Sequence, residues 1–395
     1  MSVTRFADII GHFTMRRATH HKFALFLALV ALFSPLTSRA TQIDSTYGPL
    51  PVFELHSGFW INLHHTLYEE ARQRSTAPAA RTNSPAVNPA KPVLKTAPSA
   101  KAALTPVEQH AWDDAVSFYA ANYAGKDLLF SSELILLQNQ LGDFEDCDEL
   151  SGARKQTCDA GLPPDITRVL DGAAPVYRAH QWPAHDRANR AWIARVAPLV
   201  REQGLGLSQR LADIYQTKWP AEKIRVDVTD YANWAGAYTT LDPLRVTISG
   251  TDPRNQGSAA LEVLFHEASH GIAEPVQQAI IRECHQREKA IPRDLWHALI
   301  FYTTGEVIKP VINGDANQPP ATSSSQSPHG AQPLQAPQSS RSQSSDDAYV
   351  PYAVRAGLYS RGWNEYLSLL TRFWQPYLDG RVTFSDAIAH IVSAL

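Results

Sequence analysis

The stretch Leu264-Phe-His-Glu-Ala-Ser-His270 decides how this chain is interpreted, because it has the spacing His-Glu-x-x-His. Apolar residues recur on one broad face from Ser258 onward, which predicts a helix. Residues four apart on a helix lie one above the other, so the imidazoles of His266 and His270 can bind one metal ion. Glu267 lies roughly 100° round the helix from His266, beside such an ion rather than bonded to it. The motif alone fits a surface helix equally well, so its surroundings must distinguish the two.

The amino terminus has the composition of an export signal. Basic residues within 16–22 precede an apolar run at 23–33, and small residues follow in Ser38-Arg39-Ala40. The run is shorter than the roughly 20 residues that a membrane-spanning helix needs. We therefore expect residues 1–40 to be a signal peptide cleaved near Ala40, which makes the protein periplasmic or secreted and without a stable membrane span. An uncleaved anchor is the alternative.

Composition excludes some classes of protein. The apolar fraction of 44% is enough for a substantial core, and the formal net charge of -3 is not that of a nucleic-acid-binding surface. Export permits a disulfide between Cys147 and Cys158, with Cys284 as the remaining thiol. Three unpaired cysteines are the alternative.

Two low-complexity segments interrupt the chain. Residues 75–104 are rich in Ala, Pro, Ser and Thr, and residues 315–347 are rich in Ser, Gln and Pro, so neither can bury much apolar surface. We predict both to be disordered insertions or loops. The folded parts expected around them are a helical segment at 41–74, a helical region at 105–220, a catalytic core at 221–314 and a helical region at 348–395.

Within these parts, some elements are predicted individually. Residues 53–72 are expected to form one helix, with His56, His64 and His65 packed in the core or at its rim. A role in lining a site is the alternative for these histidines. The acidic run at 143–149 lacks the spacing of a calcium-binding loop and is expected to be a solvated turn.

Alternating apolar and polar residues predict three short strands directly before the His-Glu-x-x-His helix, at 224–228, 231–240 and 244–249. After it, Asp294 is expected to cap a helix that runs from Leu295 to about Ile308. The predicted fold class is therefore α+β and mostly helical.

A third metal ligand has to come from outside the motif, because a catalytic zinc site usually has three protein ligands. Glu306 lies in the apolar run of the next helix, where a carboxylate is unfavourable unless it is paired, protonated or bound to metal. We therefore expect Glu306 to be the third ligand. Glu274 is the alternative ligand, and a water-exposed Glu306 at a helix end is the other interpretation.

Strands, the His-Glu-x-x-His helix and a helix with a glutamate follow one another over about residues 220–310. In this order the chain resembles the zincin metallopeptidases of the gluzincin type. The resemblance implies Zn²⁺ held by His266, His270 and Glu306. It also implies that Glu267 is the general base, which takes a proton from the zinc-activated water and later delivers it to the leaving amine.

The resemblance further implies a small mixed sheet whose edge strand pairs with an extended peptide substrate. The residues expected to bind substrate there are Trp234, Ala235, Gly236 and Ala237. A Tyr or His would stabilise the oxyanion, and Tyr352 is the first candidate, followed by His297 and Tyr359. The chain departs from the thermolysin-like form of the glutamate helix, because Gly305 precedes Glu306 and Pro310 follows it. The groups that orient the histidines are therefore not identified by the resemblance.

The expected function is exported, zinc-dependent hydrolysis of peptide bonds, with a peptide or protein as partner and no nucleic acid. One alternative is an exported binding or scaffold protein with a zincin-like fold and a non-catalytic metal site. A closed site with four ligands, for example with Cys284 or His285, would support it. Another alternative is a zinc hydrolase that acts on a non-peptide substrate.

Overall fold

The structure is a computed structural model that describes residues 52–76, 104–151, 161–314 and 348–395. The predicted signal peptide, Cys158, residues 77–103 and 315–347 lie outside these ranges. Among the helices in the described ranges, none is both long enough and apolar enough to span a membrane. Of the two cysteines described, Cys284 is a buried free thiol, so it forms no disulfide with Cys147. The predicted pairing of Cys147 with Cys158 stays a prediction.

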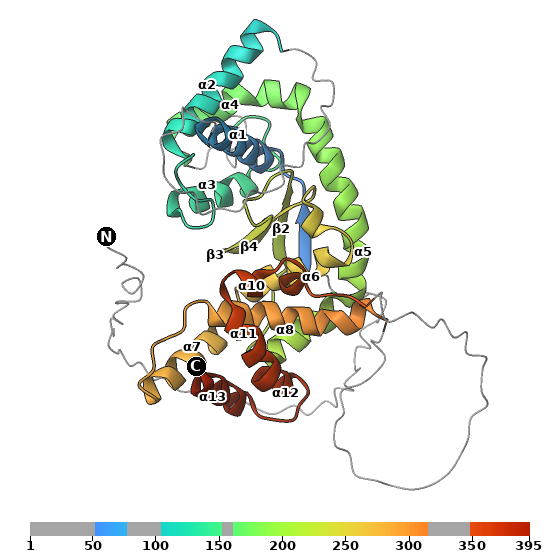
Figure 1. Cartoon of the computed structure of the whole chain (residues 1–395). Coiled ribbons are helices and arrows are strands. Elements are labelled where there is room, and N and C mark those ends of the chain that lie inside the picture. Colours follow the sequence, from blue (N-terminus) through green and yellow to red (C-terminus); the bar gives the residue numbers. More distant parts are fainter. Residues whose placement is uncertain (1–51, 77–103, 152–160, 315–347) are drawn as a thin grey trace, which may run out of the picture. The chain divides into compact units, whose positions relative to one another are not determined.

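Four short strands form one mixed sheet in the order β1-β2-β4-β3. β1 (Phe53–His56), β2 (Ile224–Thr229) and β4 (Leu244–Ser249) are parallel, and β3 (Ala237–Leu241) pairs antiparallel with β4. β3 is therefore an edge strand beside β4 (Figure 1). The mostly helical α+β fold with a small mixed sheet is confirmed.

The predicted helix over residues 53–72 is wrong at its start. Residues 53–56 form β1, and the helix α1 (Phe59–Thr76) begins only after Gly58. β1 pairs in register with β2, with Phe53 opposite Ile224. In the sequence the four alternating residues of β1 look like the start of the longer helical pattern that follows, because the partner strand β2 lies far along the chain.

One core contains the first four helices. The helix α2 (Pro106–Asn122) begins at a capping box that Thr105 forms with Glu108. His64 and His65 are buried there as expected, bonded to the hydroxyls of Tyr119 and Tyr238. The helices that pack together with the sheet residue Tyr238 are α1, α2, α3 (Ser132–Asp143) and α4 (Pro164–His180).

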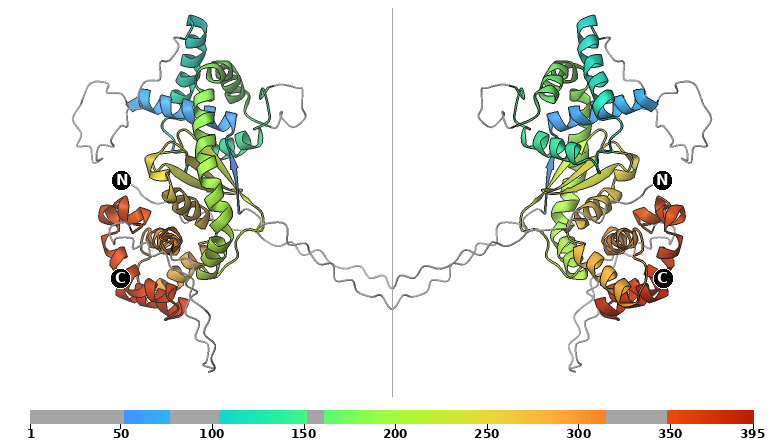
Figure 2. Two further views of the ribbon diagram at one scale, coloured as in Figure 1. Left: turned by 90° about the vertical axis from the view of Figure 1, so that its right-hand side faces the viewer. Right: turned by 90° about the vertical axis from the view of Figure 1, so that its left-hand side faces the viewer.

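A second core covers the other side of the sheet. The apolar residues of β2 alternate toward it, and α5 (Trp182–Ile214) runs along it as one unbroken helix (Figure 2). The His-Glu-x-x-His helix is α6 (Ser258–Ser269), which packs against the sheet and α8 (Leu295–Ile312). The remaining elements are α7 (Glu274–Gln286), α9 (Tyr352–Arg355), α10 (Leu358–Gly362), α11 (Asn364–Leu369), a π-helical turn at Leu370–Trp374, α12 (Gln375–Leu378) and α13 (Phe384–Ala394).

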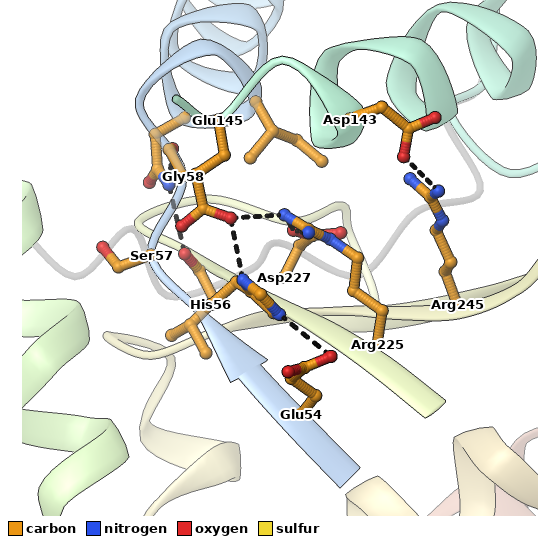
Figure 3. Close-up of polar contacts among 12 residues, drawn as sticks. Glu54, His56, Ser57, Gly58, Asp143, Glu145, Arg225, Asp227 and Arg245 are labelled. Carbon is orange, nitrogen blue, oxygen red and sulfur yellow. Dashed lines mark hydrogen bonds and ion pairs between the residues drawn. The ribbon is translucent and has the colours of Figure 1, made fainter. Parts of the chain in front are cut away.

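The polar face of the sheet carries an ion-pair network (Figure 3). Glu145 accepts hydrogen bonds from His56 Nδ1 at 2.7 Å and from Arg225 at 2.9 Å, and Arg225 also bonds to the buried Asp227. Arg245 on β4 pairs with Asp143. The acidic run at 143–149 is therefore only partly the solvated turn that was expected, because two of its carboxylates hold the end of α3 to the sheet.

Candidate metal centre

Three histidines come together between α6 and α8. His266, His270 and His297 each offer a ring nitrogen, and these atoms all lie within 4.8 Å of one another. The ring centroids are 5.0 Å apart for His266 and His270, 5.3 Å for His266 and His297, and 4.9 Å for His270 and His297. The predicted convergence of the two motif histidines is thus observed, and a third histidine joins them.

The chemical state of these histidines suits a metal. Burial lowers the pKa of His266 well below its usual value, that of His270 to about 3 and that of His297 to about 4. The imidazoles are therefore neutral near pH 7, the form that binds metal ions. Within the described part of the chain, Nδ1 of His266 is also buried without a hydrogen-bond partner. Buried polar atoms are rarely left unpaired, so the group fits a cation such as Zn²⁺.

Glu267 lies beside the histidines and is held by the edge strand. It is 9% exposed, and the hydroxyl of Thr239 on β3 is 2.7 Å from its carboxylate oxygen Oε2 and 2.8 Å from its carbonyl oxygen. Burial raises the pKa of Glu267 to about 7, and the Thr239 bond opposes that shift. A carboxyl group with a pKa near neutrality can both accept and donate a proton.

Glu306 is not part of this group. It lies on α8 nine positions after His297, which is about half a turn away round a regular helix. Its nearest charged partner is Lys309, whose Nζ lies 3.9 Å from Oε1. The alternative ligand Glu274 is exposed in the first turn of α7. The structure therefore groups the motif with His297, a residue that the sequence suggested only for oxyanion stabilisation.

Tyr352, the predicted oxyanion stabiliser, lies near the histidines, and the ring of Phe301 contacts both His266 and Tyr352. The ring of Phe301 stacks on His266 with centroids 3.4 Å apart, and the ring of Tyr352 lies 5.8 Å from Phe301. Burial raises the pKa of Tyr352, so its hydroxyl keeps its proton and can donate. Tyr359, on α10, is buried with its hydroxyl 3.5 Å from the carbonyl oxygen of Ala298 on α8.

A buried glutamate that the sequence reasoning missed holds Tyr352 in place. The carboxylate of Glu262 accepts the backbone N–H of Tyr352 at 2.9 Å and the hydroxyl of Tyr349 at 2.5 Å. Burial raises the pKa of Glu262 to about 7. Glu262 lies four residues before His266, on the same face of α6, and that spacing was the available signal.

The four predicted substrate-binding residues form the entry to the edge strand. The side chain of Asn233 accepts the N–H groups of Ala235 and Gly236, which makes a turn, and Ala237 is the first residue of β3. Gly236 has φ of +88°, a conformation that other residues rarely adopt. Trp234 is 50% exposed at this turn. The strand itself thus starts later than the sequence suggested.

No fourth protein ligand joins the histidines among the described residues. His285 is exposed on α7, and Cys284 is buried in the core as a free thiol. The group of three is therefore the arrangement that catalytic zinc sites use, rather than the four-ligand arrangement of structural sites.

Comparison with known proteins found no matching family model, no matching curated protein and no matching solved structure. The resemblance to the zincins thus has no support beyond the residues themselves. The geometry and chemistry of the site must carry any functional conclusion.

Proposed function

We propose that this protein is an exported zinc-dependent peptidase whose metal ligands are His266, His270 and His297. The observation that carries the proposal is the convergence of three neutral histidines, of which His266 is buried and His270 and His297 are partly buried, next to the buried carboxyl group of Glu267. Three protein ligands leave one coordination position open, which catalysis requires. When bound, the ion would supply Lewis-acid chemistry, polarising a carbonyl group and lowering the pKa of a water molecule.

Glu267 is the general acid and base of the proposed reaction. It takes a proton from the attacking water and passes it to the nitrogen of the leaving amine. The Thr239 hydroxyl holds the carboxylate of Glu267 through the 2.7 Å hydrogen bond. Tyr352 is the proposed donor to the oxyanion that forms on the substrate.

The edge strand β3 is the proposed site for the peptide backbone. Among the described residues β3 pairs with no strand other than β4, so an extended chain could add to its other side through main-chain hydrogen bonds. Because Thr239 belongs to β3 and bonds Glu267, a peptide added to this edge would lie next to the base.

The alternative is a binding protein with a non-catalytic metal. A structural metal site has no use for a carboxyl group beside its ligands whose pKa of about 7 suits it to accept and donate a proton. Glu267 therefore favours turnover. A zinc hydrolase with a non-peptide substrate would share the same ligands and base, and only a substrate screen separates it from a peptidase.

The test is a peptide-library screen of the zinc-loaded protein beside its Glu267→Gln variant. The variant should keep its metal and lose hydrolysis by at least about a hundredfold, the scale of general acid–base catalysis. Glu202→Gln, at an exposed position on α5, is the matched control and should keep full activity. Cleavage by Glu267→Gln at the parent's rate would refute the mechanism, and no peptide cleavage by the parent would favour the alternatives.

A further inference from the structure

A cavity of about 290 Å³ lies between α8 and the carboxy-terminal helices. One of its walls is Phe301, the ring that stacks on His266. The cavity is therefore separated from the candidate metal centre by a single aromatic ring. Its lining is mostly aromatic and apolar, and includes Phe301, Tyr302, Tyr359 and Leu367 together with Glu306 and Lys309.

Glu306 lines this cavity and has no role in the proposed reaction. Its side chain is 26% exposed, and burial raises its pKa. The Lys309 ammonium is 3.9 Å away on a side chain that is 41% exposed, which is a loose pair that the lysine can leave for water. Among the described residues the carboxylate thus has no hydrogen-bond partner. Apart from Lys309 and Thr371, the side chains around it in the cavity are apolar or aromatic.

The hydroxyls of Tyr302 and Tyr359 are not the partners of Glu306. The hydroxyl of Tyr302 donates to Gln375 at 2.8 Å, and the hydroxyl of Tyr359 points to the carbonyl of Ala298 at 3.5 Å. Their rings line the cavity while their polar ends bond elsewhere. Aromatic rings attract cations, so these walls favour a positive group near Glu306.

We propose that this cavity binds a primary ammonium group on a short apolar stem, with Glu306 as its counter-ion. Pockets for whole small molecules begin at about 300 Å³, so a cavity of about 290 Å³ suits one side chain or a small amine. Two sources have this chemistry: a lysine side chain of a bound peptide, or a free alkyl diamine. The first source rests on the proposed peptidase function, and the second does not.

The test is calorimetric binding to the full mature chain of three probes: Nα-acetyl-lysine amide, Nα-acetyl-norleucine amide and pentane-1,5-diamine. The lysine probe or the diamine should bind at least tenfold more tightly than the norleucine probe, which keeps an apolar stem and lacks the ammonium. Glu306→Gln should abolish that preference, and the exposed Glu202→Gln should keep it. Equal binding of all three probes, or an unchanged preference in Glu306→Gln, would overturn the proposal.

Lys309→Gln provides a second variant with the opposite expected sign. Removing the competing lysine should tighten ammonium binding severalfold, whereas weaker binding would show that Glu306 is not the counter-ion. The two sources are distinguished by which probes bind. Binding of the lysine amide but not of the diamine, together with cleavage next to lysine, indicates a substrate subsite. Binding of the diamine indicates a site for a free amine. Because binding needs neither metal nor turnover, it should persist in His297→Ala, so failure of the peptidase proposal is distinguishable from failure here.

Discussion

The hydroxyl of Thr239 lies 2.7 Å from the carboxylate of Glu267, and this contact joins the edge strand β3 to the His-Glu-x-x-His helix. The same hydroxyl is 2.8 Å from the Glu267 carbonyl oxygen at the end of α6. One residue of the sheet thus fixes both the proposed base and the end of the helix that carries it. The strand β3, proposed to bind a peptide, and the Glu267 carboxylate, proposed to act on that peptide, are therefore held in a fixed position relative to one another.

Replacing Thr239 with Val removes this hydroxyl while it keeps the shape and β-branching of the side chain. We expect kcat/KM to fall about 10- to 100-fold, since a hydrogen bond to a charged group contributes about 1.5–3 kcal/mol. Metal content should not change, because Thr239 contacts no histidine of the group. Thr239→Ser should restore most of the activity. Full activity in Thr239→Val would show that Glu267 does not need this contact.

Glu262 is expected to matter for the segment that carries Tyr349 and Tyr352. Glu262→Ala removes the acceptor of both the Tyr352 N–H and the Tyr349 hydroxyl, which leaves buried donors unpaired. The free energy of unfolding should fall by about 1–3 kcal/mol. Hydrogen exchange should speed up at residues 349–355 in particular. Glu202→Ala is the exposed control, and equal exchange in both variants would mean that Glu262 does not anchor the segment.

Much of this arrangement could be predicted from the sequence, and there are physical reasons why the strand β1 and the ligand role of His297 could not. The alternation in Ile224-Arg-Val-Asp-Val228 predicted β2 because one side of the sheet is apolar and the other charged. β1 was not predicted, because four alternating residues do not indicate a strand unless the partner strand β2 is known. His297 was not predicted as a ligand because its place depends on how α8 packs against α6, which no local pattern encodes.

Glu306 lies in the unusual environment that the sequence indicated, but outside the group of three histidines. Its position in an apolar helix predicted an unusual environment, and the raised pKa and cavity lining agree with that. For Glu306 to be a metal ligand, its carboxylate would have to lie on the face of α8 that is turned toward α6 and the motif histidines. The half turn between His297 and Glu306 places it on the cavity side instead.

The pair formed by His56 and Glu145 should make stability depend on pH. The Glu145 bond raises the pKa of His56 above 6.5, so its contribution is complete below pH 6.5 and is lost as pH rises through the folded pKa. The same bond lowers the pKa of Glu145 below 4.5, so that contribution is complete above pH 4.5 and is lost as pH falls through the folded pKa. The pair should therefore stabilise the fold most between about pH 4.5 and 6.5.

Urea unfolding of the parent and His56→Gln at pH 5.5 and pH 8.5 measures this contribution. We expect a difference in unfolding free energy on the order of 1 kcal/mol at pH 5.5 and a smaller one at pH 8.5. His110→Gln, at an exposed position on α2, is the control and should show no such change. A difference that does not vary with pH would assign the effect to packing instead.

The central claim is that His297, not Glu306, completes the metal site. The direct measurement is the zinc content of the purified mature chain, residues 41–395, beside His297→Ala and Glu306→Ala, by mass spectrometry after equilibration with zinc and gel filtration. We predict about one zinc per chain in the parent and in Glu306→Ala, and loss or strong weakening in His297→Ala. Zinc retained in His297→Ala and lost in Glu306→Ala would contradict the account, and a parent that binds no zinc would remove its basis.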